Sequence, residues 1–259
     1  MIKILKNVLA LPEIKTINGE DDLFLTVLHA KIIQRKRFLK NTYIDFYQRL
    51  KERLPPSDNA MFVELGSGGG FIKEVIPRII TSDILALPMV DRCFSATAMP
   101  FDDCSIDAFL LVDVLHHIAD PRAFFNEAQR CLKPRGKILM IEEANTLWGR
   151  FIYQYFHHEP FDLSAGWELQ TEGLLSRANG ALSWIIFSRD KAIFAKEFPS
   201  LVVRAVTPHT PFRYLISGGV SMRQLLPSFC YPLIKGLEIL LAPFNAYLGM
   251  FVTVEVEKK

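Results

Sequence analysis

A glycine-rich segment at residues 62–71 carries the clearest chemical pattern of the sequence. It reads as a short buried strand, an acidic residue, and glycines at alternate positions leading into a helix. Gly66 permits a tight turn, and Gly68 lets the backbone approach a ligand closely. A carboxylate at Glu64 suits an ammonium group, so we expect a ligand with an amino-acid moiety. The expected contacts in this segment are Glu64, Gly66, Ser67, Gly68 and Gly70.

The glycine spacing argues against a dinucleotide ligand. A dinucleotide fingerprint places its third glycine where Phe71 stands, whereas here Gly70 comes one residue earlier. The carboxylate of Glu64 would also repel a pyrophosphate. An NAD-dependent oxidoreductase is therefore the weakest alternative for the function. For the glycine-rich segment itself, the alternative is a turn with only a structural role.

A second carboxylate, Asp83, ends the next apolar run of the sequence. A carboxylate at the end of a parallel strand can accept hydrogen bonds from both hydroxyls of a ribose. The alternative is an aspartate that only caps a helix or stabilises a turn. Together with the glycine-rich segment, Asp83 favours a nucleoside ligand.

Two adjacent histidines are candidates for proton transfer. His116 and His117 follow an apolar run at residues 106–112, and Glu142 ends another run at 137–142. The carboxyl ends of neighbouring parallel strands meet at one edge of a sheet, so the three side chains should lie close together. A histidine oriented by a glutamate is a reasonable general base. The alternative is that both histidines only cap and pack the following helix.

A further polar stretch, His157-His158-Glu159, follows an aromatic segment predicted to be helical. Adjacent histidines point in different directions in regular structure, and no other ligand is evident in the sequence. We therefore predict a loop that lines the substrate pocket and no metal site.

These residues must be positioned by alternating strands and helices. Helical patterns run from Asp22 to Leu54, and a Pro-Pro-Ser-Asp-Asn break follows at 55–59. Beyond it, strands and helices alternate, as in an α/β fold with a doubly wound, Rossmann-like sheet. We expect an N-terminal helical arm at 1–56 and one main domain at 57–259. Acceptor-side insertions are expected at about 144–189 and 208–249.

Taken in order, these segments resemble the class I S-adenosylmethionine (SAM)-dependent methyltransferases. The first glycine-rich motif, the second-strand acidic motif and the stretch near the fourth strand all have counterparts here. The resemblance covers roughly residues 60–143. Its segments are 63–70, 81–84, 96–107, 112–118 and 132–136.

The resemblance implies a seven-stranded sheet with an antiparallel last strand, SAM as cofactor, and methyl transfer to an acceptor. It adds four residues to the cofactor site: Ile84, Ser95, Ala96 and Asp113. The family often has Asp at the position of Ser95, where it binds the adenine amino group, and serine is a weaker acceptor. A catalytically inactive SAM-binding scaffold is therefore the alternative function.

The composition of the chain limits which kinds of binding partner and cellular location are expected. The formal net charge of +2 argues against nucleic acid, and a basic cluster from Lys31 to Lys40 is read as the solvated face of a helix. Four scattered cysteines indicate neither a metal site nor a disulfide framework. We read no signal peptide, so a reducing, cytoplasmic location is expected.

The apolar insertion at 208–249 bears on the acceptor. Its stretch 239–254 is too short for a membrane-spanning helix, which needs about 20 apolar residues. Three roles are open for this insertion. It covers the sheet, forms a homodimer interface, or forms a patch that brings the enzyme peripherally to a lipid or lipid-linked glycan. In the last case Arg213, Arg223 and Lys235 suit anionic headgroups, and Phe229 and Tyr231 are the apolar contacts.

Overall fold

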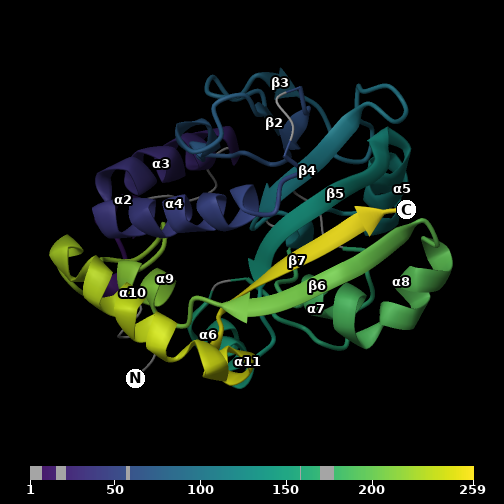
Figure 1. The fold of residues 1–259 in the computed structure, drawn as a ribbon. Helices are drawn as coiled ribbons and strands as arrows, with labels where there is room; N and C mark the ends of the chain where they lie inside the picture. Colours follow the sequence, from purple (N-terminus) through teal and green to yellow (C-terminus); the bar gives the residue numbers. More distant parts are fainter. Residues whose placement is uncertain (1–7, 16–21, 57–58, 158, 170–177) are drawn as a thin grey trace.

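A seven-stranded sheet organises the chain (Figure 1), which the computed structural model describes at residues 8–15, 22–56, 59–157, 159–169 and 178–259. The strand order is β3-β2-β1-β4-β5-β7-β6. Strands β1 to β5 are parallel, and β7 is antiparallel to both β5 and β6. This confirms the predicted sheet with its antiparallel last strand. The strands are β1 (Phe62–Glu64), β2 (Ile80–Asp83), β3 (Arg92–Cys93), β4 (Ile106–Val112), β5 (Leu132–Glu143), β6 (Leu201–His209) and β7 (Phe251–Lys258).

Helices flank this sheet, and the local sequence explains where the main ones begin. Helix α5 starts after Asp120, whose Oδ1 accepts the Ala123 N–H at 2.9 Å, and Pro121 occupies its first turn. The α-helices are α2 (Pro12–Lys15), α3 (Asp22–Arg35), α4 (Arg37–Lys51), α5 (Pro121–Cys131), α6 (Leu147–Phe156), α7 (Leu182–Trp184), α8 (Lys191–Glu197), α9 (Arg213–Ser217), α10 (Tyr231–Leu240) and α11 (Asn245–Leu248). Shorter turns are η1 (Ile72–Glu74), η2 (Leu115–His117), η3 (Ile185–Arg189), η4 (Ser228–Cys230) and η5 (Ala242–Phe244).

The segment after the glycine-rich turn differs from the prediction. A helix was expected there, but the chain forms only the single 3₁₀ turn η1. Pro77 explains the short element, because proline lacks an N–H and keeps the preceding residue out of helical geometry. The Phe71 N–H instead points at the hydroxyl of Tyr47 in α4, at 3.4 Å. The expected helix N-terminus is therefore not available to a ligand.

The N-terminal arm packs against the C-terminal insertion, with α4 beside α9 and α10 nearby (Figure 1). Asp45 of α4 accepts hydrogen bonds from the hydroxyl of Tyr231 at 2.6 Å and from Lys235 Nζ at 2.8 Å. Arg213 is buried and pairs with both Asp45 and Glu238. The expectation that Arg213 and Tyr231 face a membrane is wrong, because both belong to this internal network.

Lys36 departs from the expected solvated basic face in the same way. Its side chain is 8% exposed, and Nζ donates to the carbonyl of Met222 at 2.8 Å. The buried ammonium thus joins the arm to the insertion. Over the described residues, no helix combines the length and hydropathy that a membrane span requires.

Candidate cofactor and acceptor site

The turn after β1 is a left-handed, glycine-dependent backbone. Gly66 has φ +64° and Gly68 has φ +49°. A Cβ on Gly66 would lie 2.6 Å from Cγ1 of Val114, so any larger residue would clash as well as strain the backbone. The tight turn predicted at Gly66 is therefore present, and Gly68 shares its left-handed backbone.

Glu64 ends β1 with an unsatisfied acceptor. Its side chain is 2% exposed, and Oε2 has no hydrogen-bond partner. Burial raises the pKa of this carboxyl to about 7, although a hydrogen bond from Ser67 opposes the shift. A buried acceptor without a donor is costly, so the position fits a cationic donor such as the ammonium of SAM.

Asp83 lies beside the same turn, at the end of β2. Its Oδ2 accepts the Gly68 N–H at 2.8 Å, and Oδ1 accepts the Leu85 N–H at 2.9 Å. Both oxygens thus stabilise the backbone, and each keeps capacity for a further donor because a carboxylate oxygen accepts about two hydrogen bonds. The structure therefore brings Asp83 to the glycine turn.

The remaining predicted cofactor residues lie around the end of β2. Ile84 is 49% exposed and follows Asp83 directly. Strand β3 pairs Cys93 with Asp83, which places Ser95 and Ala96 just beyond this edge. Ser95 Oγ lies 2.8 Å from the hydroxyl of Thr97 and accepts the Thr97 N–H at 3.2 Å.

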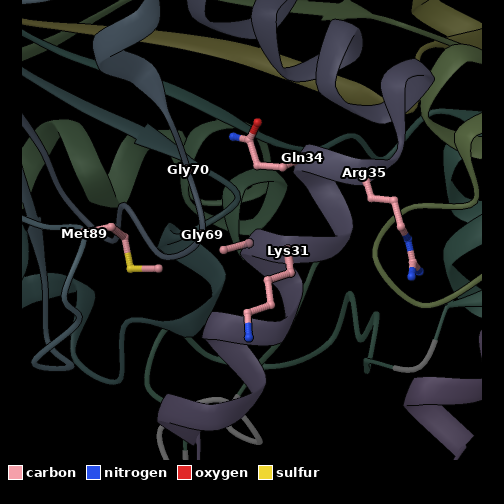
Figure 2. A pocket seen from close by; sticks show the side chains of 7 residues that line it. Lys31, Gln34, Arg35, Gly69, Gly70 and Met89 are labelled. Atoms are coloured by element: carbon pink, nitrogen blue, oxygen red, sulfur yellow. The ribbon is translucent and has the colours of Figure 1, made fainter.

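A hollow of about 520 Å³ lies on the outer side of the glycine turn (Figure 2). Gly69 and Gly70 line it together with α3 and Met89. None of the candidate carboxylates or histidines lines this hollow. The residues able to do chemistry lie instead at the carboxyl ends of β1, β4 and β5.

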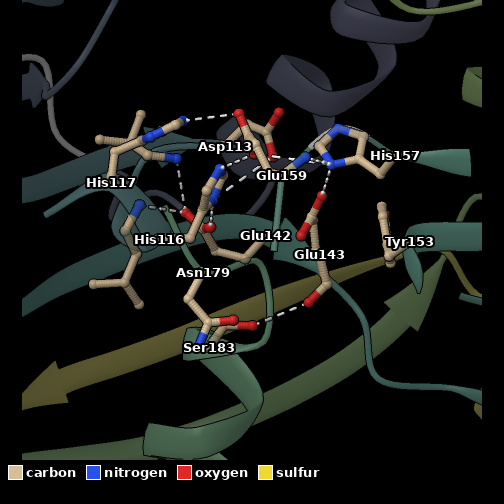
Figure 3. Close-up of polar contacts among 12 residues, drawn as sticks. Asp113, His116, His117, Glu142, Glu143, Tyr153, His157, Glu159, Asn179 and Ser183 are labelled. Carbon is tan, nitrogen blue, oxygen red and sulfur yellow. Dashed lines mark hydrogen bonds and ion pairs between the residues drawn. The ribbon is translucent and has the colours of Figure 1, made fainter. Parts of the chain in front are cut away.

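The predicted histidine–glutamate pair forms at the ends of β4 and β5 (Figure 3). Glu142 Oε2 lies 2.8 Å from Nδ1 of His116. Its other oxygen accepts the N–H groups of Val114 at 3.0 Å and Leu115 at 2.8 Å. Glu142 thus fixes both the turn η2 and the ring of His116, and both side chains are buried.

The opposite edge of the His116 ring faces Glu159. Nε2 of His116 lies 3.4 Å from one Glu159 oxygen, and Nε2 of His117 lies 3.8 Å from the other. Burial opposes charge on His116, but hydrogen bonds with Glu142 and Glu159 hold its pKa well above the usual range. Burial likewise opposes charge on Glu159, yet the hydrogen bond with His116 lowers the pKa of that carboxyl.

Asp113 lies between the cofactor turn and this cluster. Its backbone has φ +63°, an uncommon conformation for a residue other than glycine. Oδ1 has no hydrogen-bond partner, and Nδ1 of His116 is 4.0 Å away. Burial raises the pKa of Asp113 to about 7, and the charge of His116 opposes the shift. Asp113, whose side chain is 31% exposed, is thus a second residue with an unpartnered oxygen that suits an external donor.

Sequence reasoning missed how the polar stretch after α6 joins this cluster. Nδ1 of His157 lies 3.5 Å from Glu143 and 3.9 Å from Glu159. Glu143 is 3% exposed, and its Oε2 has no hydrogen-bond partner. The doubled glutamate ending β5 and the H-x-E spacing were the available signals. The neighbouring His158 falls outside the described residues.

Comparison with known proteins relates part of the chain to methyltransferases. A family model described as "Methyltransferase domain" matches residues 63–140. A ubiquinone biosynthesis O-methyltransferase of Parvibaculum lavamentivorans is 26% identical over 110 residues, which are 36% of this chain and 44% of the relative. One from Bartonella tribocorum is 24% identical over 139 residues, 47% of this chain and 56% of the relative. The chain thus spans about half the length of the curated relatives it matches.

Solved structures share the fold at low identity. A SAM-dependent methyltransferase of Thermotoga maritima is 16% identical with a TM-score of 0.53, covering 88% of this chain and 93% of that chain. A chain from the Haloferax volcanii complex of the activator Trm112 with a methyltransferase is 12% identical with a TM-score of 0.52, covering 93% and 99%. These likenesses concern the architecture of the sheet and its helices.

Proposed function

We propose, from the premise that this chain belongs to the class I SAM-dependent methyltransferases, that it methylates a hydroxyl of a small lipophilic acceptor. The observation that carries the proposal is one edge of the sheet. There an unpartnered oxygen of Glu64 lies at the end of β1, and the His116–Glu142 pair, followed by His117, lies at the ends of β4 and β5. The first can hold a cationic cofactor, and His117 can take a proton.

SAM, when bound, supplies an electrophilic methyl group on a sulfonium. Glu64 would hold its ammonium, and Asp83 would accept the ribose hydroxyls with its remaining lone pairs. The glycine turn from Gly66 to Gly70, with Ser67, would lie against the amino-acid end. Ile84, Ser95 and Ala96 would contact the adenine, while Asp113 faces the reacting end.

Of the two predicted catalytic histidines, His117 would take the proton of the acceptor hydroxyl, while the raised pKa of His116 keeps that ring protonated beside it. Glu142 orients the His116 ring at 2.8 Å, and Glu159 lies against both rings. A positioned base matters only for acceptors that lose a proton, so this arrangement favours O-methylation. The O-methyltransferase names of the two curated relatives support the same choice.

Calorimetry and label transfer test this function. The purified chain should bind SAM and S-adenosylhomocysteine but not NAD, and it should transfer label from SAM to a product in host-cell extract. Absence of heat and of a thermal shift with both SAM ligands would refute the cofactor assignment. Binding without any transfer would favour the catalytically inactive scaffold.

An exposed apolar surface on the C-terminal insertion supports a lipid-linked acceptor. Phe229 is 82% exposed and Leu240 is 75% exposed. Two charged groups of the same segment are held by internal ion pairs, Glu238 with Arg213 and Lys235 with Asp45, while Arg223 is exposed. We propose that this surface rests on a lipid layer, from a cytoplasmic location that suits the four free thiols. Its exposed members are Leu225, Leu226, Phe229, Leu233, Leu237, Ile239, Leu240, Phe244 and Tyr247.

Liposome sedimentation tests the surface separately from catalysis. The parent should sediment with anionic liposomes, and replacing Phe229 and Leu233 together with Ser should reduce this, because both side chains are exposed. Tyr231 is unsuitable for the test, since it belongs to the Arg213 network. A parent that stays in the supernatant at low salt, with a mass that falls in the double variant, would indicate a homodimer instead.

A further inference from the structure

Glu143 has an acceptor that nothing in the described chain satisfies. Its Oε2 has no hydrogen-bond partner, although the side chain is 3% exposed. A Cβ on Gly180 would lie 1.4 Å from this oxygen, so the absence of a side chain there leaves room for the carboxylate. The other oxygen, Oε1, faces His157, whose Nδ1 lies 3.5 Å away (Figure 3).

Three ligand-type side chains converge at the Glu143 carboxyl. Glu143, His157 and Glu159 each offer one nitrogen or oxygen, and these atoms lie within 4.8 Å of one another. Nδ1 of His157 lies 3.5 Å from Oε1 of Glu143 and 3.9 Å from Oε2 of Glu159. Ligands on a tetrahedral ion with bonds of about 2.0–2.1 Å are separated by about 3.4 Å. The contacts thus come close to the edges of a coordination tetrahedron.

His116 meets this set at one member, Glu159. Its Nε2 lies 3.4 Å from Glu159, while Nδ1 is held by Glu142 at 2.8 Å. A carboxylate on the far nitrogen of a metal-binding histidine fixes the tautomer and the orientation of the ring. Glu142 is in the position to do this, because its other oxygen is anchored by two backbone N–H groups.

The cluster holds more carboxyl groups than imidazoles. With all four carboxyls ionised and all three imidazoles protonated one negative charge remains, which a bound cation would balance. Mixed imidazole and carboxylate ligands suit zinc or manganese better than magnesium, which prefers oxygen alone. The members are Asp113, Glu142, Glu143 and Glu159 with His116, His117 and His157.

We infer that Glu143, His157 and Glu159, with His116, bind one divalent transition-metal ion such as Zn²⁺ or Mn²⁺. Its role rests on the proposed function: an ion there lies beside His117 and would hold an acceptor oxygen and lower its pKa. His117 is then the proton acceptor, and His116 is a ligand. The sequence argument against a metal considered only the adjacent histidines, and it lacked Glu143.

Titration calorimetry with Zn²⁺ and with Mn²⁺ tests the site without SAM. The chelator-treated parent should bind one ion per chain. Glu143→Gln is nearly isosteric, and His157→Ala changes a side chain that is 25% exposed, so both should fold and lose saturable binding. Glu142→Gln should bind about 10- to 100-fold more weakly, because it acts through His116.

Glu168→Gln is the matched control, since that carboxylate is 68% exposed and pairs with Arg122 at the surface. It should bind the ion like the parent. No saturable binding by the parent up to millimolar ion, or equal binding by the Glu143 and His157 variants, would overturn the inference. SAM calorimetry on the same chelated parent separates the two proposals, because retained SAM binding would leave the methyltransferase function standing.

Discussion

The cofactor side and the acceptor side of the site are built in different ways. The cofactor side comes mainly from one contiguous turn, Glu64 to Gly70, joined to Asp83 by a hydrogen bond between Gly68 and that carboxylate. The acceptor side is assembled from three separate segments, which end β4, end β5 and follow α6. Backbone geometry holds the first, whereas contacts between side chains hold the second.

This difference is reflected in which residues the family model matches. The matched domain spans residues 63–140, so it includes Glu64, Asp83 and Asp113. It ends before Glu142, Glu143 and Glu159. The proposed cofactor residues and both candidate histidines, His116 and His117, therefore lie inside the match, whereas the three glutamates around these histidines lie outside it.

The largest effect should come from breaking the backbone of the cofactor side. Gly66→Ala adds a Cβ at 2.6 Å from Val114 and forces alanine into φ +64°. Left-handed strain of about 1–2 kcal/mol and overpacking of about 1–3 kcal/mol should lower the free energy of unfolding. Urea denaturation measures this. Gly236→Ala is the matched control, because its Cβ would meet nothing within 4 Å, and it should not destabilise.

The next largest effect is a loss of activity on the acceptor side, without loss of cofactor binding. His117→Ala should lower turnover about 100-fold, because a positioned base contributes at least that much. The measurement is label transfer from SAM to the extract product, together with SAM affinity by calorimetry. Unchanged turnover would return His117 to a packing role, and a parallel loss of SAM affinity would erase the distinction between the two sides.

Within the cofactor side, Asp83 should matter more than Ser95. Asp83→Ala removes charge-assisted hydrogen bonds worth about 1.5–3 kcal/mol, which corresponds to roughly 10- to 100-fold in affinity for SAM. Ser95→Ala removes a neutral hydrogen bond, so about tenfold is its upper limit. Calorimetry compares both with Asp102→Ala, an exposed carboxylate of the same type. Equal affinity of Asp83→Ala and the parent would remove Asp83 from the site.

The sequence predicted the parts that depend on local chemistry. Apolar runs such as 106–112 and 137–142 identified strands β4 and β5. The meeting of His116 with Glu142 followed from the rule that parallel strands end at one edge. The helix after Gly70 was wrong, because Pro77 left room for no more than one turn, and the solvated basic face was wrong for Lys36, whose side chain is buried.

The parts that the sequence could not predict depend on the path of long connections. His157 lies 3.5 Å from Glu143 although helix α6 separates the two residues in the sequence. The periodicity of the sequence does not predict how such a connection runs in space. Arg213 and Tyr231 looked like surface residues until Asp45 of the arm supplied their partner. Tertiary pairing of side chains far apart in the sequence thus limits the prediction.

The smallest effect concerns the pH dependence of cofactor binding. Burial raises the pKa of Glu64 from 4.5 to about 7, so the cofactor-free fold favours the protonated carboxyl. The contribution of Glu64 to folding is therefore fully present below pH 4.5 and is lost as pH rises through about 7. The ammonium of SAM favours the ionised form instead. Folding without cofactor and binding of cofactor should respond to pH in opposite directions.

Between pH 6 and pH 8 the ionised fraction of a carboxyl with a pKa of about 7 rises from about one tenth to about nine tenths. SAM affinity should therefore rise about tenfold over this window, and Glu64→Gln should remove the part of the rise that this carboxyl causes. Calorimetry of the parent and the variant, in buffers of matched ionic strength, gives the difference. The acceptor-side variant His117→Ala should keep the parent's dependence, because it leaves the Glu64 carboxyl in place. An identical pH profile in the parent and Glu64→Gln would show that the unpartnered oxygen of Glu64 does not receive the ammonium.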